Sequence, residues 1–165
     1  MLFSSDNNTN LEEIRRYITV SMAGDFDSLK PHIAAAEQLY VKDVLGKDLY
    51  ESLTGWYEGS SSGSGSASGE SSDAALEKLL PYVQRPLILY AYHLGADELG
   101  VNISDQGIQI VSTDTHKQAF QWQVKGVKDS WINKAYVFTE ELLEFLEENK
   151  DDYPEWANSE AYSDS

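Results

Sequence analysis

The side chains best suited to chemistry in this sequence are a few histidines and carboxylates. Asp114 and His116 form an Asp-x-His pair, which offers the ligand types of a metal site. No second histidine follows at a ligand spacing, and the surrounding sequence STDTHK is typical of a helix cap. We therefore interpret the pair as the start of a helix, and we expect no metal and no cofactor.

The other two histidines also favour structural roles. His32 falls in the first turn of an expected helix, and His93 lies within the apolar run 86–94, where a hydrogen-bonded core histidine is commoner than a ligand. Paired acids at 140–141 and 147–148 fall on an exposed helical face, which indicates solvation and not acid–base work. The sequence has no phosphate-binding glycine loop, no nucleophilic serine motif and no cysteine. We expect a protein that is not an enzyme.

The charge of the chain is strongly negative and unevenly distributed. The 165 residues carry a formal charge of −16, and residues 140–165 hold ten acids with one lysine. An acidic segment of this kind usually solvates a helix and a tail, and it disfavours free binding to nucleic acid. It also leaves open a non-enzymatic binding module that engages a basic protein.

The elements that would position these residues are built around the run from Leu76 to Val111. Its middle, Pro86 to Leu94, has one polar side chain among apolar and tyrosine residues, which predicts a helix buried on nearly every side. Nine residues are too few to cross a bilayer, which needs about 20. After Gly95–Gly100, residues Val101–Val111 alternate between apolar and polar, which predicts a short β-hairpin that turns at Gly107.

The remaining pattern is mainly helical. We expect one helical domain over residues 1–156, with a flexible Gly/Ser insertion at 58–72 and a disordered acidic tail at 157–165. Pro81 and Pro86 predict a kinked helix or two short ones, and Gly46 is expected to end an earlier helix. The fold class is therefore mainly α: a helical bundle with one long C-terminal helix and a short β-hairpin.

The long helix, expected over about 115–150, carries more apolar surface than a small domain needs. Apolar residues recur at helical spacing along it, and at 1.5 Å per residue it would be about 50 Å long, so one end is expected to project. A projecting stripe and two free strand edges invite association. The candidate interaction residues are Ile108, Ile110, Lys117, Trp122, Lys125 and Lys128.

Four stretches resemble a known family in their order and texture. They are LKPHIAAAEQLYVKDVLGKDLYESL, ISDQGIQIVS, THKQAFQWQVK and LEFLEENKDDYPEW, within residues 28–156. The chain resembles the small helical head–tail connector, or head-completion, proteins of tailed phages and prophages of Bacteroidetes-type bacteria. The Gly/Ser insertion and the acidic tail depart from that compact pattern.

The resemblance implies a structural virion assembly protein that forms a ring between portal and tail. Its partners would be further copies of itself and a portal or tail protein. It would act in the cytoplasm of the bacterial host and then in the virion, near DNA but without sequence-specific binding, and without a membrane. Two alternatives stay open: the acidic binding module, and a hydrolase that uses Asp114 and His116.

Overall fold

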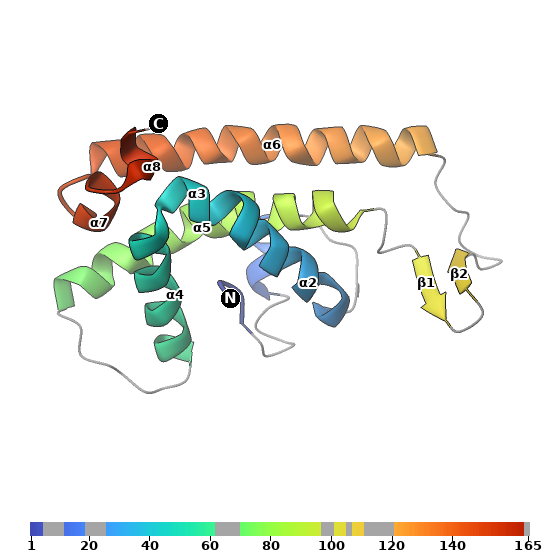
Figure 1. Cartoon of the computed structure of the whole chain (residues 1–165), viewed down its shortest axis with the longest axis horizontal. Helices are drawn as coiled ribbons and strands as arrows, with labels where there is room; N and C mark the ends of the chain where they lie inside the picture. The colour runs from blue at the N-terminus through green and yellow to red at the C-terminus, as the bar shows by residue number, and fades with distance from the viewer. Residues whose placement is uncertain are drawn as a thin grey trace.

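A computed structural model gives the arrangement of most of the chain (Figure 1). The residues that it describes are 1–4, 12–18, 26–61, 70–96, 101–104, 107–110 and 121–163.

The described part is mainly α-helical with a long C-terminal helix, which confirms that part of the predicted fold class. After a helical turn at residues 12–15, the helices are α2 (Phe26–Ala36), η1 (Glu37–Val41), α3 (Lys42–Leu45), α4 (Lys47–Ser61), α5 (Glu70–Gly95), α6 (Gln121–Glu148), α7 (Pro154–Ala157) and α8 (Glu160–Ser163). The strands are β1 (Val101–Ser104) and β2 (Gly107–Ile110).

Helix α5 occupies the centre of the helical body. It packs against α6 on one side and against α2, η1 and α4 on the other, and α6 runs along one edge of the molecule (Figure 1). The five consecutive residues Leu87 to Ala91 are all at most 3% exposed. Burial of an entire helical turn is what an apolar run without a polar face predicts, because each side of the helix meets another element.

The prolines do not divide α5. It is one helix from Glu70 to Gly95 that includes Pro81 and Pro86. Each proline removes one backbone donor, but tertiary packing of the apolar side chains around them holds the helix together. Further upstream, Gly46 ends α3 as predicted and has a φ of 72°, a conformation that favours glycine.

Two boundaries differ from the sequence-based prediction. Residues 58–61 continue α4 and residues 70–72 begin α5, so the coil predicted for 58–72 is too long at both ends; residues 62–69 lie outside the described part. Extending an established helix by a turn is easier than starting one, and serine tolerates it. The tail predicted as disordered from residue 157 instead contains α8.

Burial of Trp156 explains the order of this tail. Its indole is 0% exposed, and its Nε1 donates a hydrogen bond of 3.0 Å to the carbonyl of Val44. Tyr153, also buried, donates from its hydroxyl to the carbonyl of Ala75 at 2.8 Å. These two aromatic anchors fold the segment after α6 back onto α3 and α5, and Tyr162 of α8 packs edge-on against Trp156.

The strands form an antiparallel pair in which Val101 faces Ile110 and Ser104 faces Gly107. Figure 1 draws this hairpin past the end of α5 and near the N-terminal end of α6. In the described part of the chain each strand pairs with the other alone, so each has one edge without a partner strand.

Two glycines, one beside open space and one in close contact with a neighbouring side chain, allow a test of the packing. A Cβ on Gly126 would meet nothing within 4 Å, whereas one on Gly95 would lie 2.7 Å from Cδ2 of His32. We expect Gly126→Ala to raise the free energy of unfolding by about 0.5–1 kcal/mol, because alanine favours the helix. Gly95→Ala should lower it by about 1–3 kcal/mol through overpacking. Urea denaturation followed by circular dichroism measures both; effects of the same sign would contradict this packing.

Candidate functional site

The apolar stripe of α6 is covered by α5 over most of its described length. Ala135, Leu142 and Leu146 are buried in the core. Trp131, Phe138 and Phe145 are partly buried against it. This covered stretch, residues 131–146, needs no further partner. The prediction of excess apolar surface therefore does not apply to it.

Helix α6 continues beyond the place where α5 ends. Nδ1 of His93, in the last turn of α5, lies 3.1 Å from the carbonyl oxygen of Lys128. Helix α6 begins at Gln121, about two turns before Lys128, and Figure 1 shows this end of α6 reaching past α5. Val127, which continues the stripe, is 46% exposed. We call residues 121–128 the projecting end of α6.

The candidate residues chosen from the sequence lie at or near this end where they are described. Lys125 is exposed, and Lys128 is half-buried with its carbonyl next to His93. Trp122 belongs to α6, and Ile108 and Ile110 belong to β2, but their side chains lie outside the described part. Lys117, Asp114 and His116 also lie outside it. Their predicted roles stay predictions.

Other exposed apolar side chains of the helical body do not continue the stripe. Val137 of α6 is 58% exposed. Ten residues after Val127, it lies roughly 80° away around the helix, on the side turned from the stripe. Tyr136, 55% exposed, packs edge-on against Tyr90, which is stacked on Tyr40 at 3.9 Å between ring centroids. Residue spacing does not predict this tyrosine group, because its members come from η1, α5 and α6.

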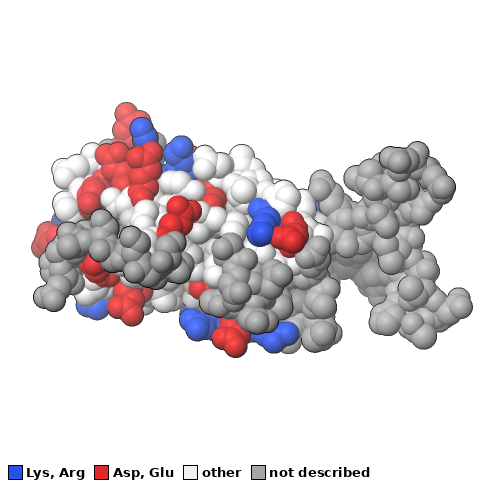
Figure 2. All heavy atoms as spheres, turned by 90° about the horizontal axis from the view of Figure 1, so that it is seen from below, with Lys and Arg blue, Asp and Glu red and all other residues white. Residues whose placement is uncertain are grey.

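Acidic side chains gather toward one end of the molecule (left in Figure 2). The exposed acids near the C-terminal end of α6 and after it are Glu144, Glu147, Glu148, Asp151, Asp152, Glu155 and Glu160. Among the described residues, no three histidine, cysteine or carboxylate side chains are grouped as a metal ion would require.

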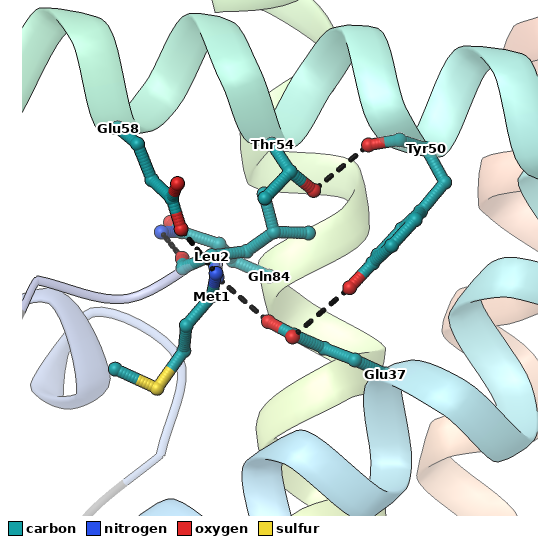
Figure 3. A network of polar contacts seen from close by, with 7 residues as sticks. All are labelled: Met1, Leu2, Glu37, Tyr50, Thr54, Glu58 and Gln84. Atoms are coloured by element: carbon teal, nitrogen blue, oxygen red, sulfur yellow. Dashed lines mark hydrogen bonds and ion pairs between the residues drawn. The ribbon is translucent and has the colours of Figure 1, made fainter.

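The least expected feature is a set of buried polar groups that holds residues 1–4. Glu37 is 4%, Gln84 2% and Glu13 9% exposed. The amide of Leu2 donates to Oε1 of Glu37 at 2.6 Å, and Nε2 of Gln84 donates to the carbonyl of Leu2 at 2.6 Å (Figure 3). The amide of Ser4 donates to Oε2 of Glu13 at 2.9 Å. We call Glu13, Glu37 and Gln84 the clamp.

Two tyrosine hydroxyls donate hydrogen bonds to the carboxyl groups of the clamp. Tyr50 donates to Oε2 of Glu37 at 3.2 Å, and Tyr57 donates to Oε1 of Glu13 at 2.5 Å. Each carboxyl group therefore receives one backbone and one phenol donor, as buried polar groups require. Burial, followed by the nearby Glu37 carboxylate, raises the pKa of Tyr50 to about 12. Burial likewise raises the pKa of Tyr17, whose hydroxyl bonds to Gln84 at 3.0 Å.

No helix in the described part of the chain is both long and apolar enough to cross a membrane.

The described part of the chain is mainly α-helical. The chain belongs to DUF6712, a family of unknown function, whose model matches residues 41–165. The match begins at the last residue of η1 and extends over α5, the hairpin and α6, but it does not include residues 1–4 or α2. No curated protein and no solved structure matches the chain.

Removing a carboxyl group from the clamp tests how much the clamp contributes to the free energy of unfolding. We expect Glu37→Ala to lower the free energy of unfolding by about 2 kcal/mol, because the amide of Leu2 and the hydroxyl of Tyr50 lose their acceptor. Glu51→Ala is the control, since Glu51 is exposed and lies 3.9 Å from Lys47. That change should stay within about 0.5 kcal/mol. Equal effects in urea denaturation would show that the clamp adds no stability.

The raised pKa of Tyr50 gives a prediction at high pH. The pKa of a phenol in the unfolded chain is about 10, so the folded protein holds its proton more tightly. Its contribution to stability is therefore complete below pH 10 and is lost as pH rises toward 12. In Tyr50→Phe, the free energy of unfolding should fall less between pH 10 and 12 than in the wild-type protein. Absorbance titration of the variant should lack one phenol that titrates near pH 12. Unchanged curves would contradict this.

Proposed function

We propose that the protein is a structural subunit of a head–tail connector, and that copies of it assemble into a ring between portal and tail. The observation that carries this proposal is the projecting end of α6, where the helix continues past α5 and Val127 of the stripe is 46% exposed. An exposed apolar helix surface gains free energy when a neighbouring molecule buries it. The resemblance of residues 28–156 to connector proteins supports the same function.

A ring requires two different surfaces on each subunit, because each copy meets the next in a head-to-tail manner. The projecting end of α6 supplies one such surface. The hairpin is a candidate for contacts with a neighbour, since each strand has an edge without a partner strand in the described residues. Ile108 and Ile110 of β2 and Trp122 of α6 are the side chains proposed for these contacts.

The negative charge of the chain is consistent with a subunit that lies near DNA but does not bind it tightly. A formal charge of −16 repels the phosphate backbone, so non-specific attraction is weak. Lys125 and Lys128 are positively charged residues at the projecting end. We propose that they contact an acidic surface of a neighbouring subunit or of the portal.

The acidic binding module is the second candidate, and one groove favours it. The groove lies between α4, α5 and α7, and its lining includes Glu51, Asp73, Asp152 and Glu155, together with the aromatic Trp56. A basic segment would be complementary to this lining. If the protein stays monomeric and binds a basic protein with an affinity that falls steeply as salt is added, this function is favoured over the connector.

A matched pair of substitutions on α6 tests the proposed assembly. Val127→Lys places a charge on the projecting stripe, and we expect it to weaken self-association or portal binding at least tenfold. Val137→Lys makes the same change at an exposed valine off the stripe, and association should be unaltered. Light scattering over a range of concentrations, alone and with a portal ring, measures both variants.

Both substitutions should leave the fold intact, because both side chains are exposed and lysine is a better helix former than valine. Equal association of the two variants would contradict the role of the projecting end. A wild-type protein that remains monomeric and ignores the portal would contradict the connector function itself.

A further inference from the structure

A groove with an acidic lining lies at the end of the molecule where the chain folds back after α6. It is bounded by α4, the start of α5 and α7, and its volume is about 520 Å³. Pockets that hold ligands typically measure about 300–1,000 Å³. We call it the acidic groove. Among the described residues of its lining, none is basic and four are acidic, namely Glu51, Asp73, Asp152 and Glu155.

The acidic groove also has an apolar wall. Trp56 lines it and is only partly buried, whereas Leu49 and Leu76 of the same lining belong to the core. Carboxylates around a partly exposed aromatic ring are complementary to positive charge, and the ring itself attracts cations and apolar groups. The occupant that suits this groove is therefore basic and partly apolar.

The projecting end of α6 has both properties. Lys125, Gly126 and Val127 are consecutive and all exposed, so the helix is open here on several of its sides. Residues 125–134 include three lysines and one aspartate, whereas residues 135–148 include five glutamates and no basic residue. The partial positive charge of a helix N-terminus adds to that of the lysines. A basic helix end that is exposed on several sides is suited to a groove.

The two surfaces cannot meet within one molecule. Helix α6 rises by about 30 Å between Val127 and Glu148. Helices α4 and α7, which border the groove, lie near the opposite end of the molecule from the start of α6 (Figure 1). Each copy therefore carries two separated surfaces of opposite charge. Surfaces of this kind join copies head to tail, in a ring where the rotation closes and in a chain where it does not.

From these observations we propose that the projecting end of α6 of one copy docks in the acidic groove of the next copy. Val127 packs against Trp56, and Lys125 and Lys128 lie beside the carboxylates of α4 and α7. This inference rests on the self-association proposed above, and it names the surface that receives the projecting end. The basic occupant of the groove is then a second copy of the same protein.

Cross-linking without a spacer tests this contact on the unaltered full-length protein. A carbodiimide joins an amine to a carboxylate only where the two groups are in contact. Because Lys125 and Lys128 are far from Glu155 within one copy, each link between them joins two copies. The pair of Lys30 and Asp27, which are 2.6 Å apart within α2, is the control and should be linked in every sample.

The protein is cross-linked at low and at high concentration, the monomeric and assembled fractions are separated, and mass spectrometry identifies the linked residues. In the assembled fraction alone, we expect links that join Lys125 or Lys128 to Glu51, Asp152 or Glu155. An assembled fraction that contains the control link but none of these links would overturn the proposal and leave the connector function standing.

Charge reversal tests the same contact without a chemical agent. Lys125→Glu with Lys128→Glu, or Glu51→Lys with Glu155→Lys, places like charges opposite one another, and each pair should weaken self-association at least about tenfold. A chain with all four substitutions should associate within about threefold of the wild-type protein, because its charges are complementary again. Light scattering at about 0.15 M salt, where distant charges are screened, measures association.

Glu144→Lys with Glu147→Lys is the matched control for the groove variant. It makes the same change of net charge at exposed acids of α6 that are not among the residues lining the groove, so association should be unaltered. Circular dichroism shows whether each variant is folded. Equal weakening by the control and the groove variant, or no recovery in the chain with all four substitutions, would overturn the proposal.

The remaining outcomes separate this contact from the functions proposed above. A wild-type protein that stays monomeric at every concentration would overturn the contact. A groove variant that associates normally but loses affinity for a basic protein would also overturn it, because that protein is then the occupant. Links between the projecting end and the groove, in an assembly that fails to bind a portal, would support the contact and contradict the connector function.

Discussion

The structure depends on the packing of α6 against a helix that ends before it does. Helix α5 covers the apolar stripe from Trp131 to Leu146 and stops at Gly95, near Lys128. Van der Waals and hydrophobic contacts hold the two helices together over this stretch, and they are reinforced by the ion pair of 3.0 Å between Arg85 and Glu141. Helix α6 begins seven residues before Lys128, and Val127 of the stripe is 46% exposed there.

On the other side of α5 the same apolar core continues against α2, η1 and α4 and includes Leu2 and Phe3. Polar side chains there also bond to the backbone of residues 1–4. Gln84 belongs to α5 itself, so the central helix takes part in both halves of the molecule.

Prediction from the sequence succeeded where one element determines its own pattern. The run from Pro86 to Leu94 is apolar on all sides, and it lies in the core because no side of such a helix favours water. Gly46 ends its helix because it adopts a positive φ. The stripe of α6 was found from its spacing, but its coverage by α5 was not, because spacing within a helix carries no information about where a neighbour stops.

The clamp was not predictable for a related reason. Glu13 and Glu37 look like ordinary solvated acids in the sequence, and nothing adjacent to them marks them as buried. Their donors come from residues 2, 4, 50 and 57, which only the fold brings together. The order of the tail likewise depends on Trp156 reaching Val44, a contact across 112 positions of the chain. Long-range contacts of this kind determine the candidate surfaces far more than local pattern does.

If copies of the protein assemble through the projecting end of α6, assembly buries residues 121–128. Amide hydrogen exchange, measured at low and at high protein concentration, reports this burial directly. The amides of residues 121–128 should exchange more slowly in the concentrated, assembled protein, while those of residues 131–146 are protected equally in both samples. Unchanged exchange at residues 121–128, in a sample whose mass shows assembly, would contradict it.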